Sequence, residues 1–277
     1  MQFRASSISS SSDQLRALTR HRTALGGSWD ATLLVALLVL LAGSAWIALW
    51  SLGDSPYVHL FHAHGAPMCA SRQISNAMFA LLFVCGWLLM TVAMMLPASI
   101  PLLVIFHSVC RARANALLLT SLVVLGYLAT WLGFGIAAYA AAAAIARAAN
   151  NLSWIQSRPW TLTAGVLLLA GLYQFSPLKY RCLDKCRSPF SFIAGHWHGG
   201  RKHTEAFMLG ISHGAFCVGC CWALMLLMIP IGAGNLGWML MLAVVMAVEK
   251  NLRVGKLMAK PLGAALVTLA IFVALKD

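Results

Sequence analysis

The stretch that decides the fold reads His213-Gly214-Ala215-Phe216-Cys217-Val218-Gly219-Cys220-Cys221-Trp222, and it lies inside the apolar segment 205–229. A helix of this length can cross the roughly 30 Å hydrocarbon core of a bilayer. Ionisable and metal-ligating side chains are costly in that setting and indicate a functional site. We therefore predict that a membrane-spanning helix carries the chemistry of this protein.

The composition of the whole chain agrees with a membrane protein. Hydrophobic residues make up 61% of the 277 residues and charged residues only 10%, whereas soluble domains carry about 25% charged residues. The net charge of +13 is divided into short basic clusters between apolar runs, which is typical of membrane loops rather than of nucleic-acid binding. No phosphate loop, dinucleotide fingerprint or Ser/His/Asp arrangement occurs. We expect a lipid bilayer as partner and no nucleic acid.

Apolar runs of suitable length predict an all-α, polytopic transmembrane helix bundle with about seven spans. The runs are 31–53, 75–97, 115–146, 160–177, 205–229, 231–249 and 260–276. Residues 1–30 precede the first run and form a basic, serine-rich tail that we expect to be disordered. The chain therefore divides into this tail and a single helical domain at 31–277.

Basic residues are unevenly distributed between the two sides that alternating spans define. With the N-terminus inside, 16 of the 20 Lys and Arg residues fall on the inner side. Cytoplasmic loops carry such an excess, so the count predicts a cytoplasmic N-terminus. It also predicts an outer loop at 54–74 and an inner basic loop at 178–204.

The fifth span carries a stripe of soft metal ligands. Helix positions three and four apart share a face, so His213 and Cys217 lie in line with Cys220 or Cys221. An imidazole with two thiols suits Cu(I) or Zn(II). Alternatively, the cysteines are small hydrophobes that help helices pack closely. The glycines that would permit such packing are Gly210, Gly214 and Gly219.

A second cysteine pair, Cys182 and Cys186, lies in the inner loop. Nearby basic residues favour thiolate, and the i,i+4 spacing is compatible with a shared metal ion. The basic residues are Lys179, Arg181, Lys185 and Arg187. The alternative is a basic loop that contacts anionic lipid and carries incidental cysteines.

The outer loop is the third candidate site. It contains His59, His62, His64 and Cys69, and short His-rich tracts often bind metal. Imidazole and thiol together suit copper. Exposed histidines are also commonly solvated residues without a role, and this alternative stays open.

The second span offers thioether ligands at Met90, Met94 and Met95. Methionine is also a flexible filler of hydrophobic cores. Pro97 removes an intrahelical hydrogen bond and should kink or end this helix. Glu249, at the end of the sixth run, is most simply paired with Lys250 or another base.

Several motifs together resemble a bacterial family of predicted metal-binding integral membrane proteins, a domain-of-unknown-function family. They are Met90-Thr91-Val92-Ala93-Met94-Met95-Leu96-Pro97, Tyr173 to Lys179 with Cys182 and Cys186-Arg187-Ser188-Pro189, Gly210 to Gly214, Cys217 to Met225, and Glu249-Lys250. The likeness covers roughly residues 75 to 255, so the outer loop lies outside it. The resemblance implies a metal-binding, multi-pass protein of the bacterial inner membrane.

These observations predict a copper-handling protein without a catalytic site. Copper, as Cu(I), is the expected ion and zinc the alternative; the ion would be transported, relayed or delivered to a metalloenzyme. A metallochaperone or a neighbouring metalloenzyme complex is the expected partner. Two other classes stay open: a membrane thiol–disulfide oxidoreductase, in which one cysteine group exchanges with the other, and a non-catalytic scaffold subunit.

Overall fold

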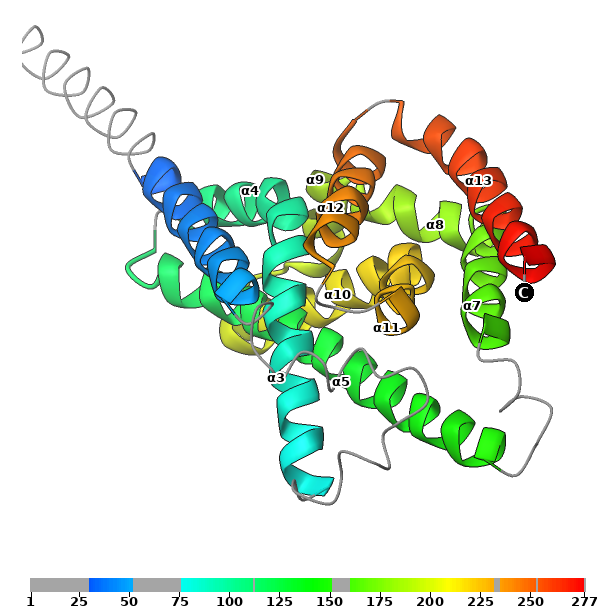
Figure 1. The fold of residues 1–277 in the computed structure, drawn as a ribbon. Coiled ribbons are helices and arrows are strands. Elements are labelled where there is room, and N and C mark those ends of the chain that lie inside the picture. The colour runs from blue at the N-terminus through cyan, green and yellow to red at the C-terminus, as the bar shows by residue number, and fades with distance from the viewer. Residues whose placement is uncertain are drawn as a thin grey trace, which may run out of the picture.

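The computed structural model describes residues 30–51, 76–111, 113–150, 160–231, 235–252 and 254–276. These residues are largely helical and contain no strand, which confirms the all-α class (Figure 1). The helices are Asp30–Ser51, α3 (Asn76–Met94), η2 (Pro97–Ser99), α4 (Ile100–Cys110), α5 (Ala116–Asn150), α7 (Trp160–Tyr173), α8 (Pro177–Cys186), α9 (Pro189–His196), α10 (Lys202–Leu226), α11 (Met228–Ile231), α12 (Leu236–Asn251) and α13 (Gly255–Lys276).

By length and composition, four described helices can cross a membrane: Asp30–Ser51, Ala116–Ala148, Lys202–Pro230 and Gly255–Lys276. Two bent pairs raise the number to six if each pair is one span. The pairs are Ala80–Met94 with Pro97–Cys110, bent by 47°, and Trp160–Tyr173 with Pro177–Cys186, bent by 68°. The expected seventh span is not confirmed, because α12 has 16 residues and is about 24 Å long at 1.5 Å per residue.

Prolines set the bends and the helix starts. Pro97 follows the end of α3, as predicted, and opens the 3-10 turn η2. Pro177 and Pro189 stand at the first positions of α8 and α9, where the missing N–H costs nothing. The Ser176 hydroxyl caps α8 by accepting from the Leu178 N–H at 3.2 Å. The predicted inner loop 178–204 therefore contains two short helices.

Helix α10 lies at the centre of the bundle (Figure 1) and makes its most extensive contact with α5. Glycines allow the two backbones to approach closely. A Cβ on Gly210 would lie 2.1 Å from the Val123 carbonyl oxygen, and one on Gly214 would lie 2.8 Å from the Thr130 side chain. The predicted packing role of these two glycines is thus present in the structure.

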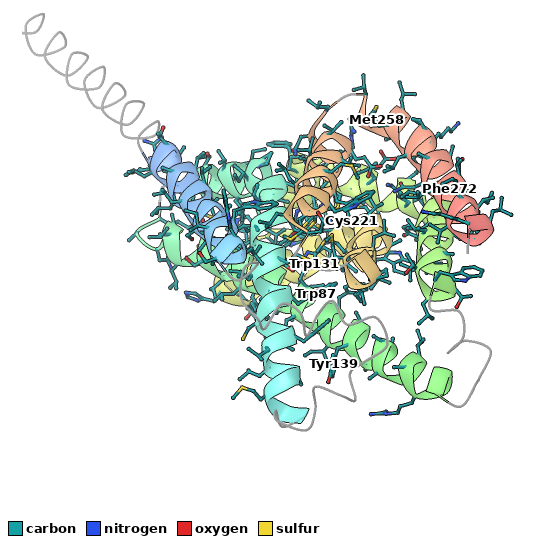
Figure 2. All side chains as sticks on the ribbon, viewed as in Figure 1. Trp87, Trp131, Tyr139, Cys221, Met258 and Phe272 are labelled. Carbon is teal, nitrogen blue, oxygen red and sulfur yellow. The ribbon has the colours of Figure 1, made fainter. Side chains whose placement is uncertain are left out.

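The exterior of the described helices is apolar and the interior contains charge. On α13, Phe272 is 61% exposed and projects outward, whereas Trp131 on α5 is completely buried (Figure 2). Lys179, Glu249 and Lys250 are buried. An apolar exterior around buried ionic groups is compatible with a protein that lies in lipid.

Candidate metal centre

Helix α10 buries three thiols on one side. Cys217, Cys220 and Cys221 are each at most 2% exposed, and their spacing of three and four residues places them within one helical turn. Close contact with α5 through Gly210 and Gly214 fixes this part of α10. The predicted stripe of the fifth span is therefore buried inside the bundle.

Two other segments bring sulfur atoms to the same place. Met95, which follows α3, has its Sδ 3.6 Å from the Cys221 Sγ. Cys186, the last residue of α8, has its Sγ 4.0 Å from the Cys220 Sγ. We call these five residues, Met95, Cys186, Cys217, Cys220 and Cys221, the sulfur cluster. It joins ligands that lie up to 126 positions apart in the chain.

Two thiols of the sulfur cluster are turned toward the backbone. Both the Cys220 and Cys221 Sγ donate to the Cys217 carbonyl oxygen, at 3.1 and 2.9 Å. All cysteines in the described part of the chain are free. Across those same residues, no three His, Cys, Asp or Glu side chains are arranged to enclose a metal ion. A metal ion would therefore require rotation of these thiols away from the carbonyl.

A buried cation and a phenol contact the sulfur cluster. The Lys250 Nζ lies 2.9 Å from the Cys217 Sγ and 3.5 Å from the Met95 Sδ. The Tyr127 hydroxyl lies 3.0 Å from the Cys217 Sγ and donates to the Met95 carbonyl oxygen at 3.3 Å. A buried charge needs a hydrogen-bonding or oppositely charged partner, and the Cys217 thiol lies within hydrogen-bonding distance of Lys250.

Next to Lys250, a buried ion pair joins α8 to α12. The Lys179 Nζ lies 2.8 and 2.7 Å from the two carboxylate oxygens of Glu249, and also donates to the Gln174 side-chain oxygen. Arg187 donates from Nη1 to the Glu249 backbone carbonyl oxygen at 2.7 Å. Glu249 therefore pairs with Lys179 rather than with its neighbour Lys250. The network fixes the position from which Lys250 reaches the sulfur cluster.

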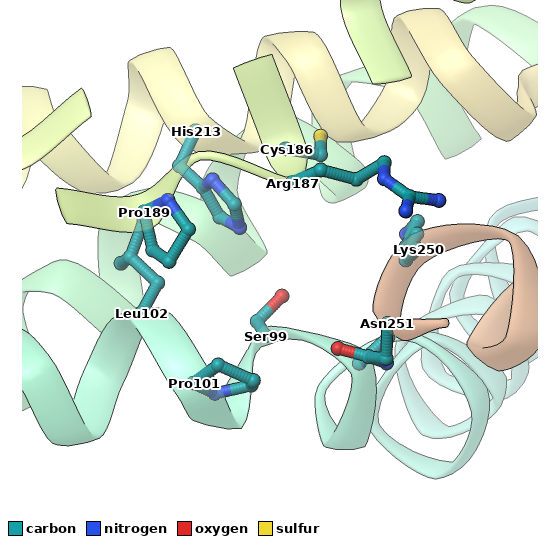
Figure 3. A pocket seen from close by; sticks show the side chains of 10 residues that line it. Ser99, Pro101, Leu102, Cys186, Arg187, Pro189, His213, Lys250 and Asn251 are labelled. Carbon is teal, nitrogen blue, oxygen red and sulfur yellow. The ribbon is translucent and has the colours of Figure 1, made fainter. Parts of the chain in front are cut away.

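His213 is 4% exposed and stands between two rings. Its imidazole stacks on Tyr127 and meets Phe192 edge-on, with centroid distances of 5.7 Å in both cases. The Nδ1 atom is buried without a hydrogen-bond partner. His213 lines a cavity of about 160 Å³ (Figure 3). The structure thus places this predicted ligand in the cavity wall, and no hydrogen bond to the sulfur cluster is found for its Nδ1.

The other predicted ligands fall into three groups. Cys182 is buried on α8, and its Sγ lies against Gly219 of α10. Gly219 directly precedes Cys220 in the sequence. Met90 and Met94 are buried in the hydrophobic core. The outer-loop residues lie outside the described part of the chain: His59, His62, His64 and Cys69.

The polar neighbours of the sulfur cluster were not among the predicted site residues. Lys250 and Lys179 are ionisable residues at the ends of apolar runs, a signal that intramembrane charge is functional. Tyr127 gave no comparable signal, because a tyrosine inside an apolar helix is common. Its contact with Cys217 bridges 90 positions of the sequence, which spacing alone does not predict.

The fold and the site together define an all-helical protein with a buried group of soft sulfur ligands. Residues 84–273 match the family model PpoB2, described as a copper chaperone. Because this range is more than half of the chain, the protein belongs to that family. No curated protein and no solved structure matches the chain. Family membership confirms the predicted relation to copper, and the matched range includes the entire sulfur cluster.

Proposed function

We propose that this protein is a membrane-embedded copper chaperone that holds Cu(I) on the sulfur cluster and delivers it to a metalloenzyme. The observation that carries the proposal is a close group of three buried thiols and one buried thioether, joined by the half-buried thiol of Cys186, which lies 4.0 Å from the Cys220 Sγ. Thiolate and thioether sulfur are the ligands that Cu(I) prefers. Membership of a copper chaperone family supports the choice of copper over zinc.

The charges around the sulfur cluster favour a thiolate complex of a monovalent ion. Lys179 and Glu249 neutralise each other. Lys250 contacts the Cys217 and Met95 sulfur atoms, and Arg187 follows Cys186 and lines the same cavity as Lys250. Three thiolates with one Cu(I) carry a net charge of minus two. These two basic side chains would balance that charge, which is required when ionic groups are buried.

Binding would proceed by exchange of contacts. The Cys220 and Cys221 thiols would leave the Cys217 carbonyl oxygen, lose their protons and form copper–sulfur bonds. Met95 would supply a neutral, weaker ligand at the edge of the sulfur cluster. A site with one readily replaced ligand suits a chaperone, because the ion has to leave again.

We further propose a seven-span topology with the N-terminus in the cytoplasm of a bacterium and the chain in its inner membrane. The basic residues concentrated on one side support this orientation. Helix α12 would be a short crossing, since a bilayer can thin locally around a short helix. His59, His62, His64 and Cys69 would then face outward and capture copper before it reaches the sulfur cluster.

Copper content of the purified protein tests the proposal. The protein is isolated in mild detergent without oxygen, loaded with Cu(I) and desalted before metal analysis. We expect near-stoichiometric copper in the wild type and its loss in Cys217→Ser/Cys220→Ser/Cys221→Ser. Cys85→Ser, at an exposed cysteine of α3, is the control and should retain copper.

Two results would contradict the proposal. One is equal copper in the wild type and the triple variant, which would place the ion elsewhere. The other is a metal-free wild type with a reducible disulfide between Cys217 and Cys220 or Cys221, which would favour thiol–disulfide exchange as the function.

A further inference from the structure

The cavity beside the sulfur cluster has a basic lining. Among the described residues that form its wall are Ser99, Cys186, Arg187, His213, Lys250 and Asn251, and no acidic residue is among them. We call it the basic cavity. Asn251 and Pro101 are exposed at its rim, whereas His213 and Lys250 are buried at its inner end. The basic cavity therefore leads from the surface of the described fold to the sulfur cluster.

Polar groups converge on this space from different elements. Figure 3 shows the His213 ring and the Ser99 hydroxyl directed into it from opposite walls, with the Arg187 side chain extending toward Lys250. The His213 Nδ1 is buried and has no hydrogen-bond partner. A buried polar atom without a partner is rare, and it belongs to a side chain that lines this space.

One residue links the basic cavity to the sulfur cluster. Cys186 lies in the cavity wall with its sulfur turned toward α10 (Figure 3), where it meets the Cys220 Sγ at 4.0 Å. A ligand in the basic cavity would therefore reach Cys186 before the more deeply buried thiols.

Resting on the proposed function, we infer that the basic cavity is the port through which copper is exchanged with a small anionic thiol. The volume of about 160 Å³ is close to that of an engineered protein cavity that holds benzene, so a thiol of that size fits. Arg187 and Lys250 attract the anion, and a positively lined space disfavours a free cation such as Cu(I).

The exchange is a ligand substitution without redox change. Each incoming anionic thiol forms a bond from its sulfur to Cu(I), and one bond between copper and a cysteine of the sulfur cluster breaks, until no bond to the sulfur cluster remains. The proton of the incoming thiol passes to the departing cysteine sulfur. Copper stays monovalent throughout, and the same steps in reverse load the sulfur cluster.

Thiols that differ in charge test this port. Copper-loaded protein is mixed with mercaptoacetate, mercaptoethanol or cysteamine at equal concentration, and the rate of copper loss is followed by rapid desalting. We expect mercaptoacetate to be fastest, by roughly tenfold over mercaptoethanol, since charged clefts raise association rates by about 10–10³. Thiol reactivity alone predicts the opposite order, because the ammonium of cysteamine favours its thiolate form.

Substitutions of Arg187 and Arg181 test whether Arg187 causes the difference in rate between the anionic and the neutral thiol. Arg187→Gln should bring the rates for mercaptoacetate and mercaptoethanol together, and Arg187→Lys should retain the difference. Arg181→Gln, at an exposed position of α8, is the matched control and should behave as wild type. Two results overturn the port but leave the proposed copper function intact. One is that cysteamine removes copper from the wild type fastest, and the other is that Arg187→Gln keeps the wild-type ratio of the mercaptoacetate and mercaptoethanol rates. A wild type that takes up no copper overturns both.

Discussion

At the scale of single residues, Lys250 decides the electrostatics of the sulfur cluster. Its ammonium contacts both a thiol and a thioether, at 2.9 and 3.5 Å. In the absence of copper it is the cation that these sulfur atoms face. With copper bound, it would offset the negative charge of the thiolate complex. The same side chain also forms part of the basic cavity, so it stands between the site and its proposed port.

Replacing Lys250 by methionine tests this role. The copper complex of Lys250→Met would carry one uncompensated negative charge inside the protein, so we expect the Cu(I) affinity to fall about tenfold, or about 1.4 kcal/mol. Competition with a coloured Cu(I) chelator measures the change. Lys250→Arg keeps the charge and should stay close to wild type. An affinity of Lys250→Met equal to or above the wild-type value would contradict the charge-balance argument.

The ion pair between Lys179 and Glu249 makes a separate prediction. Both side chains are at most 2% exposed, so Glu249→Leu leaves a buried ammonium without its partner and should cost about 3–5 kcal/mol of stability. Lys179→Met/Glu249→Leu removes both charges and should recover most of the loss. Denaturant unfolding in detergent of the two single variants and the double variant measures the coupling. Additive losses in the double variant would mean that the two groups do not stabilise each other.

At the scale of elements, the contact between α5 and α10 positions the site. Tyr127 of α5 touches Cys217 of α10 at 3.0 Å, and this distance depends on the close approach at Gly210. The Cβ of Gly210→Ala would lie 2.1 Å from the Val123 carbonyl oxygen and 3.0 Å from the Tyr127 backbone nitrogen. Because these neighbours are backbone atoms, the helices would have to separate.

We therefore expect Gly210→Ala to lower both stability and copper affinity. Overpacking of this kind typically costs about 1–3 kcal/mol. The control is Gly133→Ala in α5, where a Cβ would meet nothing within 4 Å and the better helix propensity of alanine should stabilise slightly. Thermal unfolding and chelator competition on both variants check the prediction. Equal effects at the two positions would show that the close contact does not position the site.

The helices show how far the sequence predicts the structure. Periodicity and apolar length predicted α10 and its cysteine stripe, because both depend on neighbours within one helix. They also predicted the break at Pro97. The helices of the inner segment were not expected, since their polar, basic composition resembles a loop. Contacts between distant elements decide that Met95, rather than Met90 or Met94, lies against Cys221. Such contacts also place Cys186 next to Cys220.

At the scale of the whole molecule, the number of spans decides on which side of the membrane each end of the chain lies. Six spans by length and composition place both ends of the chain on one side, whereas seven crossings place them on opposite sides. A reporter fused after residue 277 distinguishes these cases. With a cytoplasmic N-terminus and α12 as a short crossing, the C-terminus lies outside the cytoplasm. We therefore expect an active fusion with alkaline phosphatase and a non-fluorescent fusion with green fluorescent protein. The reverse pattern would mean that α12 does not cross the membrane.

The most direct test of the central claim is the X-ray absorption spectrum of the protein loaded with one equivalent of copper under anaerobic conditions. Binding by the sulfur cluster predicts a Cu(I) edge and a first coordination shell made of sulfur alone. The spectrum should lose this shell in Cys217→Ser/Cys220→Ser/Cys221→Ser and keep it in Cys85→Ser. A first shell of nitrogen or oxygen in the wild type would contradict the claim, because copper would then be held by histidine or carboxylate ligands instead of the buried thiols.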